Sequence, residues 1–279
     1  MTEYLTIDGG TIAYEVTGDG PLIVLAHGVG DSRDAFRAVV PSLVEAGHRV
    51  AAVDLRGCGE SSVDWPEWSR TAIAGDLLAL IRHLGGPAVI VGHSVSGGAA
   101  TIAAALEPSL VTAVVELAPF TRKQSPSLGG MLKVKRYRRG MMRLLGTAMF
   151  GSLPLWRAYL DVAYPGRRPA DWAERLGRIE SLLREPGRMK AMQAMGRSAP
   201  TDAGAQLGNV RCPVLVVMGT LDPDWADPRA EGTAVVEDLP SGLGRLEMID
   251  GAGHYPHDQF PEQVVSLVLD FLRSDAARA

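Results

Sequence analysis

The chain has 279 residues, of which 46% are hydrophobic and 22% charged, and its formal net charge is −4 at pH 7. This composition is that of an ordinary globular protein and excludes a disordered or low-complexity chain. No apolar run approaches the roughly 20 residues that a membrane-spanning helix needs, so we expect no membrane span. Residues 1–4 lack the basic start of a secretory signal, and we expect a cytoplasmic protein.

The first 120 residues alternate strand-like and helix-like segments. A continuous apolar run at 21–26 is typical of a strand buried on both faces, and Gly47 is a helix stop. We expect strands at 11–17, 21–26, 50–53, 88–91 and 111–117, and helices at 34–46, 71–84 and 96–106. This alternation predicts an α/β protein with a mostly parallel sheet.

The alternation stops after Pro119 and resumes near residue 214. Residues 121–200 contain helical pieces without a convincing strand, and they carry 17 Lys and Arg against 5 Asp and Glu. Strands at 214–218 and 245–249 and helices at 229–237 and 262–272 then follow. We therefore expect a core domain made of 1–120 and 201–279, with 121–200 inserted as a helical cap.

Ser94 stands between a buried strand and a helix of small residues. Gly92 and Ser96 flank it two positions away on each side, where the backbone crosses itself closely and a large side chain would clash. A serine in such a sharp turn can present its hydroxyl at the carboxyl edge of the sheet. A glycine-rich turn with an incidental serine is the alternative. We predict that Ser94 is a nucleophile.

A serine nucleophile needs a base that is oriented by an acid. Among the six histidines, His254 has the most suitable context, a glycine-rich loop after a predicted strand, and Asp222 follows the preceding strand. We predict His254 as the base and Asp222 as the acid. The neighbouring Asp224 and Asp227 are expected to lie in a solvated loop or to cap a helix.

The loop after the strand at 21–26 is expected to complete the site. An acyl-transfer site needs two backbone N–H groups where the oxyanion forms, and we predict those of Val29 and Val95. His27 and His93 lie beside turns, and we expect them to make structural hydrogen bonds.

The chain resembles the α/β-hydrolase superfamily from about residue 11 to 272. Five motifs carry this resemblance: residues 92–96, His27-Gly28, 54–61, 219–222 and Gly253-His254. The resemblance implies the α/β-hydrolase fold: an eight-stranded, mostly parallel sheet with a helical cap inserted after the sixth strand. Residues 54–61 are structural in that family. Halide-cleaving and epoxide-opening relatives have Asp at the position that Ser94 occupies here, so Ser94 argues against both activities.

The predicted function is hydrolysis of a carboxylic ester or related acyl bond through an acyl-enzyme on Ser94. Thioester hydrolysis, carbon–carbon bond hydrolysis, acyl transfer and perhydrolysis use the same three side chains and stay open. A hydrolase-fold ligand receptor with slow or no turnover is an alternative of another class. A site of this kind needs no cofactor and no metal.

Other kinds of site are less well supported by the sequence. The pair Gly28 and Gly30 resembles part of a dinucleotide motif, but the third glycine position holds Arg33. His254 and His257 have no third metal ligand at a helpful spacing. Cys58 and Cys212 are too few for a disulfide framework, and we expect unreactive thiols.

The predicted cap gives the only indication of a substrate or partner. It holds seven of the ten methionines, together with Trp156 and Trp172, which can line an apolar pocket or form ordinary core. Its basic run at 133–139 is either a solvated face or a docking site for an anionic partner. Acyl carrier protein, a coenzyme A thioester and an acidic membrane surface are the candidates. We expect that the protein does not bind nucleic acid, and the sequence predicts no oligomeric state.

Overall fold

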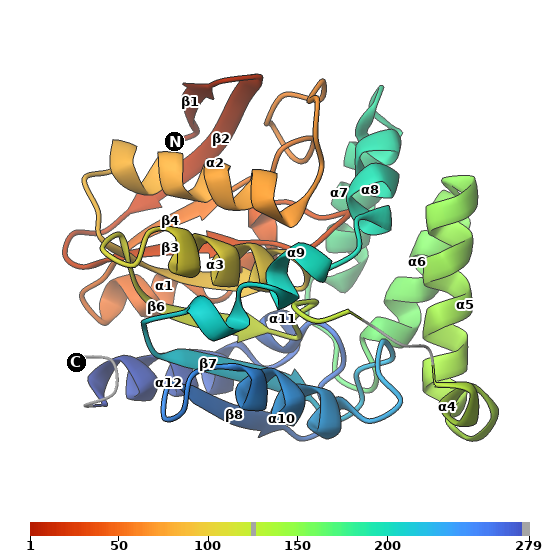
Figure 1. Ribbon diagram of the computed structural model, residues 1–279. Coiled ribbons are helices and arrows are strands. Elements are labelled where there is room, and N and C mark those ends of the chain that lie inside the picture. The colour runs from red at the N-terminus through yellow and green to blue at the C-terminus, as the bar shows by residue number, and fades with distance from the viewer. Residues whose placement is uncertain (124–126, 275–279) are drawn as a thin grey trace.

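The computed structural model describes residues 1–123 and 127–274. Its centre is one eight-stranded sheet in the order β1-β2-β4-β3-β5-β6-β7-β8 (Figure 1). The strands are β1 (Glu3–Ile7), β2 (Gly10–Thr17), β3 (Leu22–Ala26), β4 (Arg49–Val53), β5 (Ala88–His93), β6 (Val111–Leu117), β7 (Val214–Gly219) and β8 (Gly244–Ile249). β2 pairs antiparallel with β1 and β4, whereas all other neighbours are parallel. The predicted mostly parallel sheet is confirmed.

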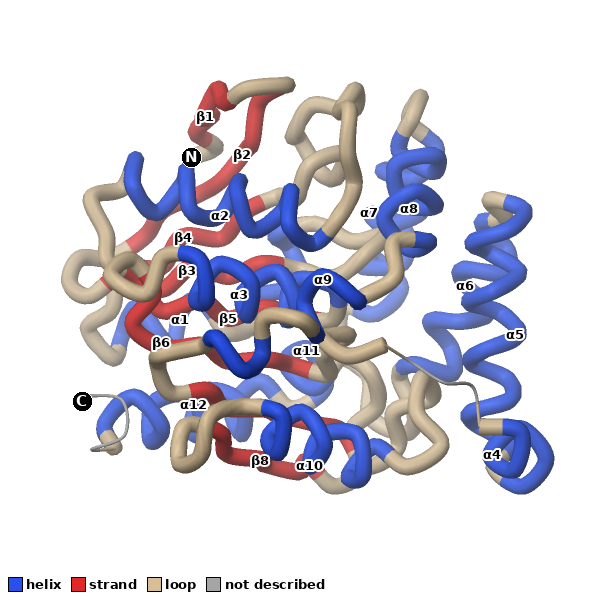
Figure 2. The backbone as a smooth tube through the Cα atoms, viewed as in Figure 1, coloured by secondary structure: helices blue, strands red, loops and turns tan. Residues whose placement is uncertain are grey.

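Helices cover both faces of this sheet. The helical segments are η1 (Arg33–Phe36), α1 (Val40–Glu45), α2 (Arg70–His83), α3 (Val95–Leu106), α4 (Leu128–Lys133), α5 (Lys135–Phe150), α6 (Leu153–Ala163), α7 (Trp172–Arg184), α8 (Arg188–Arg197), α9 (Thr201–Gly204), η2 (Leu207–Asn209), α10 (Pro228–Asp238), α11 (Pro256–Gln259) and α12 (Pro261–Arg273). Figure 2 shows the strands as a layer with helices around it.

Strand β3 shows how the sequence forms the two halves of the core. Leu22, Val24 and Ala26 pack on the face covered by α2, α3 and α10, whereas Ile23 and Leu25 pack on the face covered by α1 and α12. Successive side chains of a strand point to opposite faces, so a strand between two helical layers has to be apolar throughout. This explains the unbroken apolar run that identified β3.

Helices α4 to α8 lie between β6 and β7 in the chain. They have an apolar cluster of their own, whose largest fully buried members are Trp156, Tyr159 and Tyr164 of 153–164, packed against Tyr255 of the core. Figure 1 shows α5 and α6 beside the carboxyl ends of the central strands. We call α4–α8 the inserted helices.

Two expectations about the elements differ from the structure. The single helix expected at 34–46 is divided into η1 and α1, because Pro41 cannot donate the backbone hydrogen bond that a continuous helix needs there. The edge strand β1, whose residues are exposed or only partly buried, is not among the predicted strands. In the described ranges, none of the helices is long and apolar enough to cross a bilayer.

Candidate active site

Ser94 occupies a strained turn at the carboxyl end of β5. Its φ of 57° and ψ of −117° are unusual for a residue with a side chain, and α3 begins at the next residue. A Cβ atom at Gly92 would lie only 2.2 Å from the carbonyl oxygen of Ser96, so the turn requires glycine there. The geometry therefore matches the sharp strand-to-helix turn that the sequence indicated.

Ser96 does more than fill the small position of this turn. Its hydroxyl donates a 2.6 Å hydrogen bond to the carbonyl oxygen of His27, at the end of β3. A Cβ atom at Gly28 would approach within 3.0 Å of the Ser94 Cβ and 2.8 Å of His93 Nδ1. The two loops are thus held in close contact, and Ser96 supplies a hydrogen bond that glycine could not.

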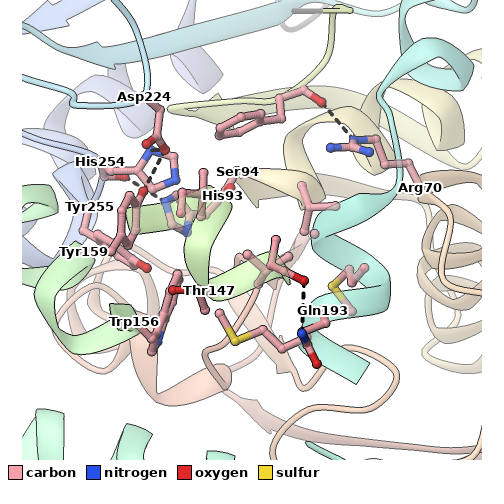
Figure 3. A pocket seen from close by; sticks show the side chains of 18 residues that line it. Arg70, His93, Ser94, Thr147, Trp156, Tyr159, Gln193, Asp224, His254 and Tyr255 are labelled. Carbon is pink, nitrogen blue, oxygen red and sulfur yellow. Dashed lines mark hydrogen bonds and ion pairs between the residues drawn. The ribbon is translucent and has the colours of Figure 1, made fainter. Parts of the chain in front are cut away.

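The structure brings the three predicted catalytic residues to the same edge of the sheet. Asp222 and His254 follow β7 and β8, and His254 Nδ1 lies 3.1 Å from Asp222 Oδ2. Ser94 and His254 line one pocket (Figure 3), and Asp222 is fully buried. Among described side chains the Ser94 hydroxyl makes no hydrogen bond to His254, a contact that often tightens only with substrate.

Asp224 belongs to this cluster, and the expectation of a solvated or helix-capping role for it is wrong. Its carboxylate is buried, with Oδ2 at 3.2 Å from His254 Nδ1, and it accepts a 2.7 Å hydrogen bond from the Tyr159 hydroxyl of α6. Its backbone N–H donates to Asp222 at 2.9 Å. Asp227, by contrast, caps α10 as expected. A second carboxylate two residues after Asp222 was the signal available in the sequence.

The two carboxylates change the protonation of His254. Burial alone lowers a histidine pKa, but the charges of Asp222 and Asp224 outweigh it and raise the pKa of His254 to about 9. Burial, together with the nearby charge of Asp222, raises the pKa of Asp224 to about 6, against the opposing effect of His254. Ligand atoms of these three residues all lie within 4.8 Å of one another, a spacing that could also hold a cation.

The predicted oxyanion groups lie beside the nucleophile. Val29 and Val95 both line the pocket, and within the described residues neither backbone N–H donates a hydrogen bond. His27 accepts a 3.1 Å hydrogen bond from the Leu55 N–H, and His93 Nε2 lies 2.8 Å from the His254 carbonyl oxygen. These two buried histidines make structural hydrogen bonds, as expected.

The pocket, about 660 Å³ including the space open to solvent, is mainly apolar. The inserted helices contribute Leu144, Thr147, Ala148, Trp156, Tyr159, Met192, Gln193, Met195 and Gly196 to its lining. Trp172 instead packs against Tyr164, and Met142 and Met149 are exposed. The expectation that cap methionines and tryptophans line a pocket is thus met by only part of the set.

Arg70 lies at the pocket and connects the two ends of the insertion. Its Nε donates to the Phe120 carbonyl oxygen at 2.9 Å and its Nη1 to that of Ser198 at 2.7 Å. Phe120 follows β6 and Ser198 follows α8, so one guanidinium holds both connections (Figure 3 shows the first contact). Nothing in the sequence pattern distinguished this arginine.

The groups considered for other chemistry have structural partners. Arg33 pairs with the Asp54 carboxylate, which also accepts the Arg33 backbone N–H at 2.7 Å, so this carboxylate is not free for a ribose hydroxyl. Burial raises the pKa of Cys58 to about 12 and that of Cys212 to about 11. Neither thiol is ionised near neutral pH.

Comparisons with known proteins point to one family. A model of the alpha/beta hydrolase family matches residues 23–267. A 2-(acetamidomethylene)succinate hydrolase from Mesorhizobium japonicum is 28% identical over 279 aligned residues, covering 95% of this chain and 94% of the relative.

Solved structures show the same relationship. A thermophilic esterase from Thermogutta terrifontis is 26% identical with a TM-score of 0.73, covering 98% of each chain. An enol-lactonase from Burkholderia xenovorans LB400, at 21% identity, superposes with a TM-score of 0.77 over 98% of this chain and 100% of the other. With its eight-stranded sheet, the turn at Ser94 and a family match over most of its length, the chain belongs to the alpha/beta hydrolase family.

Proposed function

We propose that the protein is a serine hydrolase that cleaves carboxylic esters through an acyl-enzyme on Ser94. The observation that carries this proposal is the position of Ser94 in a strained turn, facing the same pocket as His254, whose Nδ1 is held by Asp222. Similarity to an esterase over 98% of both chains supports the choice of an ester bond.

In the proposed mechanism the neutral imidazole of His254 takes the Ser94 hydroxyl proton as the oxygen attacks the ester carbonyl carbon. The oxyanion of the tetrahedral intermediate accepts hydrogen bonds from the backbone N–H groups of Val29 and Val95. His254 returns the proton to the departing alcohol oxygen, which leaves an ester on Ser94. Water then attacks that ester with the same base, releasing the acid.

Asp222 holds His254 in the tautomer that presents Nε2 to the serine and stabilises the imidazolium that forms. Asp224 adds a second negative charge at Nδ1, within 3.2 Å. Because this charge raises the pKa of His254, the base is fully neutral only in alkaline solution. We therefore expect the hydrolysis rate to rise with pH up to about pH 9.

We further propose that residues 121–200 act as a cap that determines which acyl groups fit. Its helices supply half of the pocket lining, mostly with apolar side chains such as Leu144, Trp156 and Met192. A pocket of this character favours an apolar acyl group of medium size. Tyr159 extends from the cap to Asp224, so the cap also contacts the acid side of the site.

The test is hydrolysis of p-nitrophenyl esters of increasing acyl length by the wild-type protein and by Ser94→Ala. We expect turnover in the wild type and a loss of at least about 10³-fold in Ser94→Ala, because no other group can form the acyl-enzyme. A fluorophosphonate probe should label only proteins that retain Ser94.

Ser241→Ala is the matched control, since Ser241 is exposed and does not line the pocket. It should hydrolyse esters and take up the probe as the wild type does. A stoichiometric burst without turnover would instead favour acyl transfer or a slow ligand receptor. Equal turnover in Ser94→Ala and the wild type would disprove the proposal.

A further inference from the structure

The outward side of α4 and α5 exposes most of the large apolar side chains found on the described surface. Ten such side chains are exposed in the described residues, and six of them lie between 128 and 150: Leu128, Leu132, Met142, Leu145, Met149 and Phe150. Leu132 is 81% exposed and Phe150 73% exposed. Figure 1 shows α5 at the outer edge of the molecule, with α6 between it and α7. We call these six side chains the outer apolar face.

The same stretch of chain carries only positive charge. Residues 121–160 contain nine Lys and Arg and no Asp or Glu, while the other residues contain 19 and 32, so +9 and −13 sum to the net −4. Lys133, Lys135, Arg138 and Arg139 are exposed, and none of them forms an ion pair with a carboxylate in the described ranges. The apolar face is therefore bordered by unpaired cations.

Helical geometry places both kinds of side chain on one side of α5. At 100° per residue, the exposed residues Lys135, Arg138, Arg139, Met142, Leu145, Met149 and Phe150 fall within an arc of roughly 140°. The cations occupy the first turns and the apolar side chains the last turns. A single surface can thus contact both sets together.

We propose that this side of α4 and α5 docks the protein on an anionic phospholipid surface. The lysines and arginines pair with the headgroup phosphates. The leucines, methionines and Phe150 insert at the boundary between the headgroups and the acyl chains. The acidic remainder of the molecule is repelled by the same surface, so the docked orientation is defined.

Two other occupants fit the observations less well. In a two-fold dimer through this face the same basic side chains would oppose one another, with no carboxylate between 121 and 160 to compensate. A soluble anionic carrier would match the charge, but six large apolar side chains around a convex helix edge are accommodated better by a fluid lipid boundary.

Docking would bring the pocket close to the lipid. Leu144, Thr147 and Ala148 of α5 line the pocket that contains Ser94, on the side opposite the outer apolar face. The pocket then lies about one helix diameter, roughly 10 Å, from the surface. Only this consequence, delivery of an apolar acyl substrate from the bilayer, rests on the proposed function; the docking itself does not.

The experiment is co-sedimentation of the full chain with vesicles of phosphatidylcholine, alone or with about a third of phosphatidylglycerol. We expect at least about tenfold tighter binding to the anionic vesicles, weakening as sodium chloride rises from about 50 to about 500 mM. Arg138→Glu/Arg139→Glu should abolish this preference. Leu145→Gln/Met149→Gln should weaken binding by about tenfold even at low salt, because the lost apolar contacts are not screened.

Exposed residues of the same types elsewhere provide the controls. Arg229→Glu/Arg273→Glu and Leu106→Gln should bind vesicles as the wild type does. Ser94→Ala should also bind normally, which separates docking from catalysis. The proposal is overturned if the wild type does not bind anionic vesicles, or if the outer-face variants bind them as tightly as the controls do. A dimer that Leu145→Gln/Met149→Gln dissociates, without vesicle binding, would assign the face to a second copy.

Discussion

Two carboxylates contact one imidazole nitrogen in this protein. His254 Nδ1 lies 3.1 Å from Asp222 and 3.2 Å from Asp224, and both acids are buried. Asp224 also accepts the Tyr159 hydroxyl, so its carboxylate is fixed from a second side. The arrangement holds the imidazolium strongly, which benefits the charged intermediate but disfavours the neutral base that starts the reaction.

This arrangement predicts different effects for the two acids. Asp222→Asn should lower kcat by on the order of 10²- to 10³-fold, less than complete loss, because Asp224 remains near Nδ1. Asp224→Asn should lower kcat by about tenfold or less and move the rising limb of the pH–rate profile to lower pH. The sign follows because the Asp224 charge is one of the causes that raise the pKa of His254. Steady-state rates from pH 6 to pH 10 measure both effects.

The double variant Asp222→Asn/Asp224→Asn is the control for shared function. It should be at least about tenfold slower than Asp222→Asn alone, since no carboxylate is left beside the imidazole. If the double variant and Asp222→Asn have equal rates, Asp224 makes no contribution to catalysis. An unchanged pH profile in Asp224→Asn would contradict the predicted electrostatic effect.

At the scale of elements, α7 is joined to two loops of the site by ion pairs. The fully buried Arg175 donates to Asp31 at 2.6 Å and to Asp258 at 3.0 Å. Asp31 lies in the loop that carries Val29, and Asp258 lies in α11, directly after the His254 loop. Tyr164 donates to the same Asp258 at 2.7 Å. The inserted helices thus contact both loops through a satisfied buried network.

Removal of Arg175 should therefore destabilise the folded protein. Arg175→Met leaves the buried Asp31 without a cationic partner and leaves Asp258 paired only with Arg37, at 2.8 Å. We expect a loss of about 3–5 kcal/mol in the free energy of unfolding. The reason is that the buried Asp31 carboxylate loses the charge that compensates its desolvation, and the buried Asp258 loses one of its two. Urea-induced unfolding followed by circular dichroism measures the effect.

Arg157→Met is the matched control on α6. Its side chain is 58% exposed and pairs with Glu180 at 3.0 Å, so its removal should change stability by less than about 1 kcal/mol. Similar losses in the two variants would show that the buried network contributes no more than a surface ion pair.

At the scale of the whole molecule, buried titratable groups set how stability depends on pH. Burial lowers the pKa of His27, lowers that of His93 well below its ordinary value and lowers that of His257 to about 3. Burial raises the pKa of Glu116, which accepts hydrogen bonds from Thr101 and Thr121, to about 7.

These shifts predict a maximum of stability near pH 6.5 to 7. Below pH 6.5 the unfolded chain binds protons on three histidines that the folded state keeps neutral, so the free energy of unfolding falls as pH falls. The folded state holds protons that the unfolded chain releases on Glu116 between pH 4.5 and about 7, and on His254 between 6.5 and about 9. Stability on the alkaline side therefore falls as pH rises. Urea midpoints at pH 5, 7 and 9 test the curve.

Glu116→Gln separates one contribution from the rest. It should be more stable than the wild type at pH 9, where the buried carboxylate is ionised, and nearly equal to it at pH 4.5, where both side chains are neutral. Glu107→Gln, on a side chain that is 40% exposed, should show no such difference. A wild type that is most stable at pH 9 would contradict the predicted curve.

Features that depend on neighbours along the chain could be predicted from the sequence. Ser94 was identifiable because a buried strand, a glycine and a run of small residues surround it, and His254 and Asp222 because each follows an apolar strand. The parallel sheet follows from the same alternation, since strands buried on both faces are apolar throughout. Their roles in catalysis stay a prediction until Ser94→Ala is measured.

Features that join distant segments of the chain could be recognised only in the folded structure. Asp224 lies 65 positions from Tyr159, and Arg175 lies 144 positions from Asp31. Which acid is buried, which arginine is desolvated and which side of α5 faces water all depend on what packs against each residue. Local sequence carries little of that information, because burial and pairing arise from contacts that form only when the chain has folded.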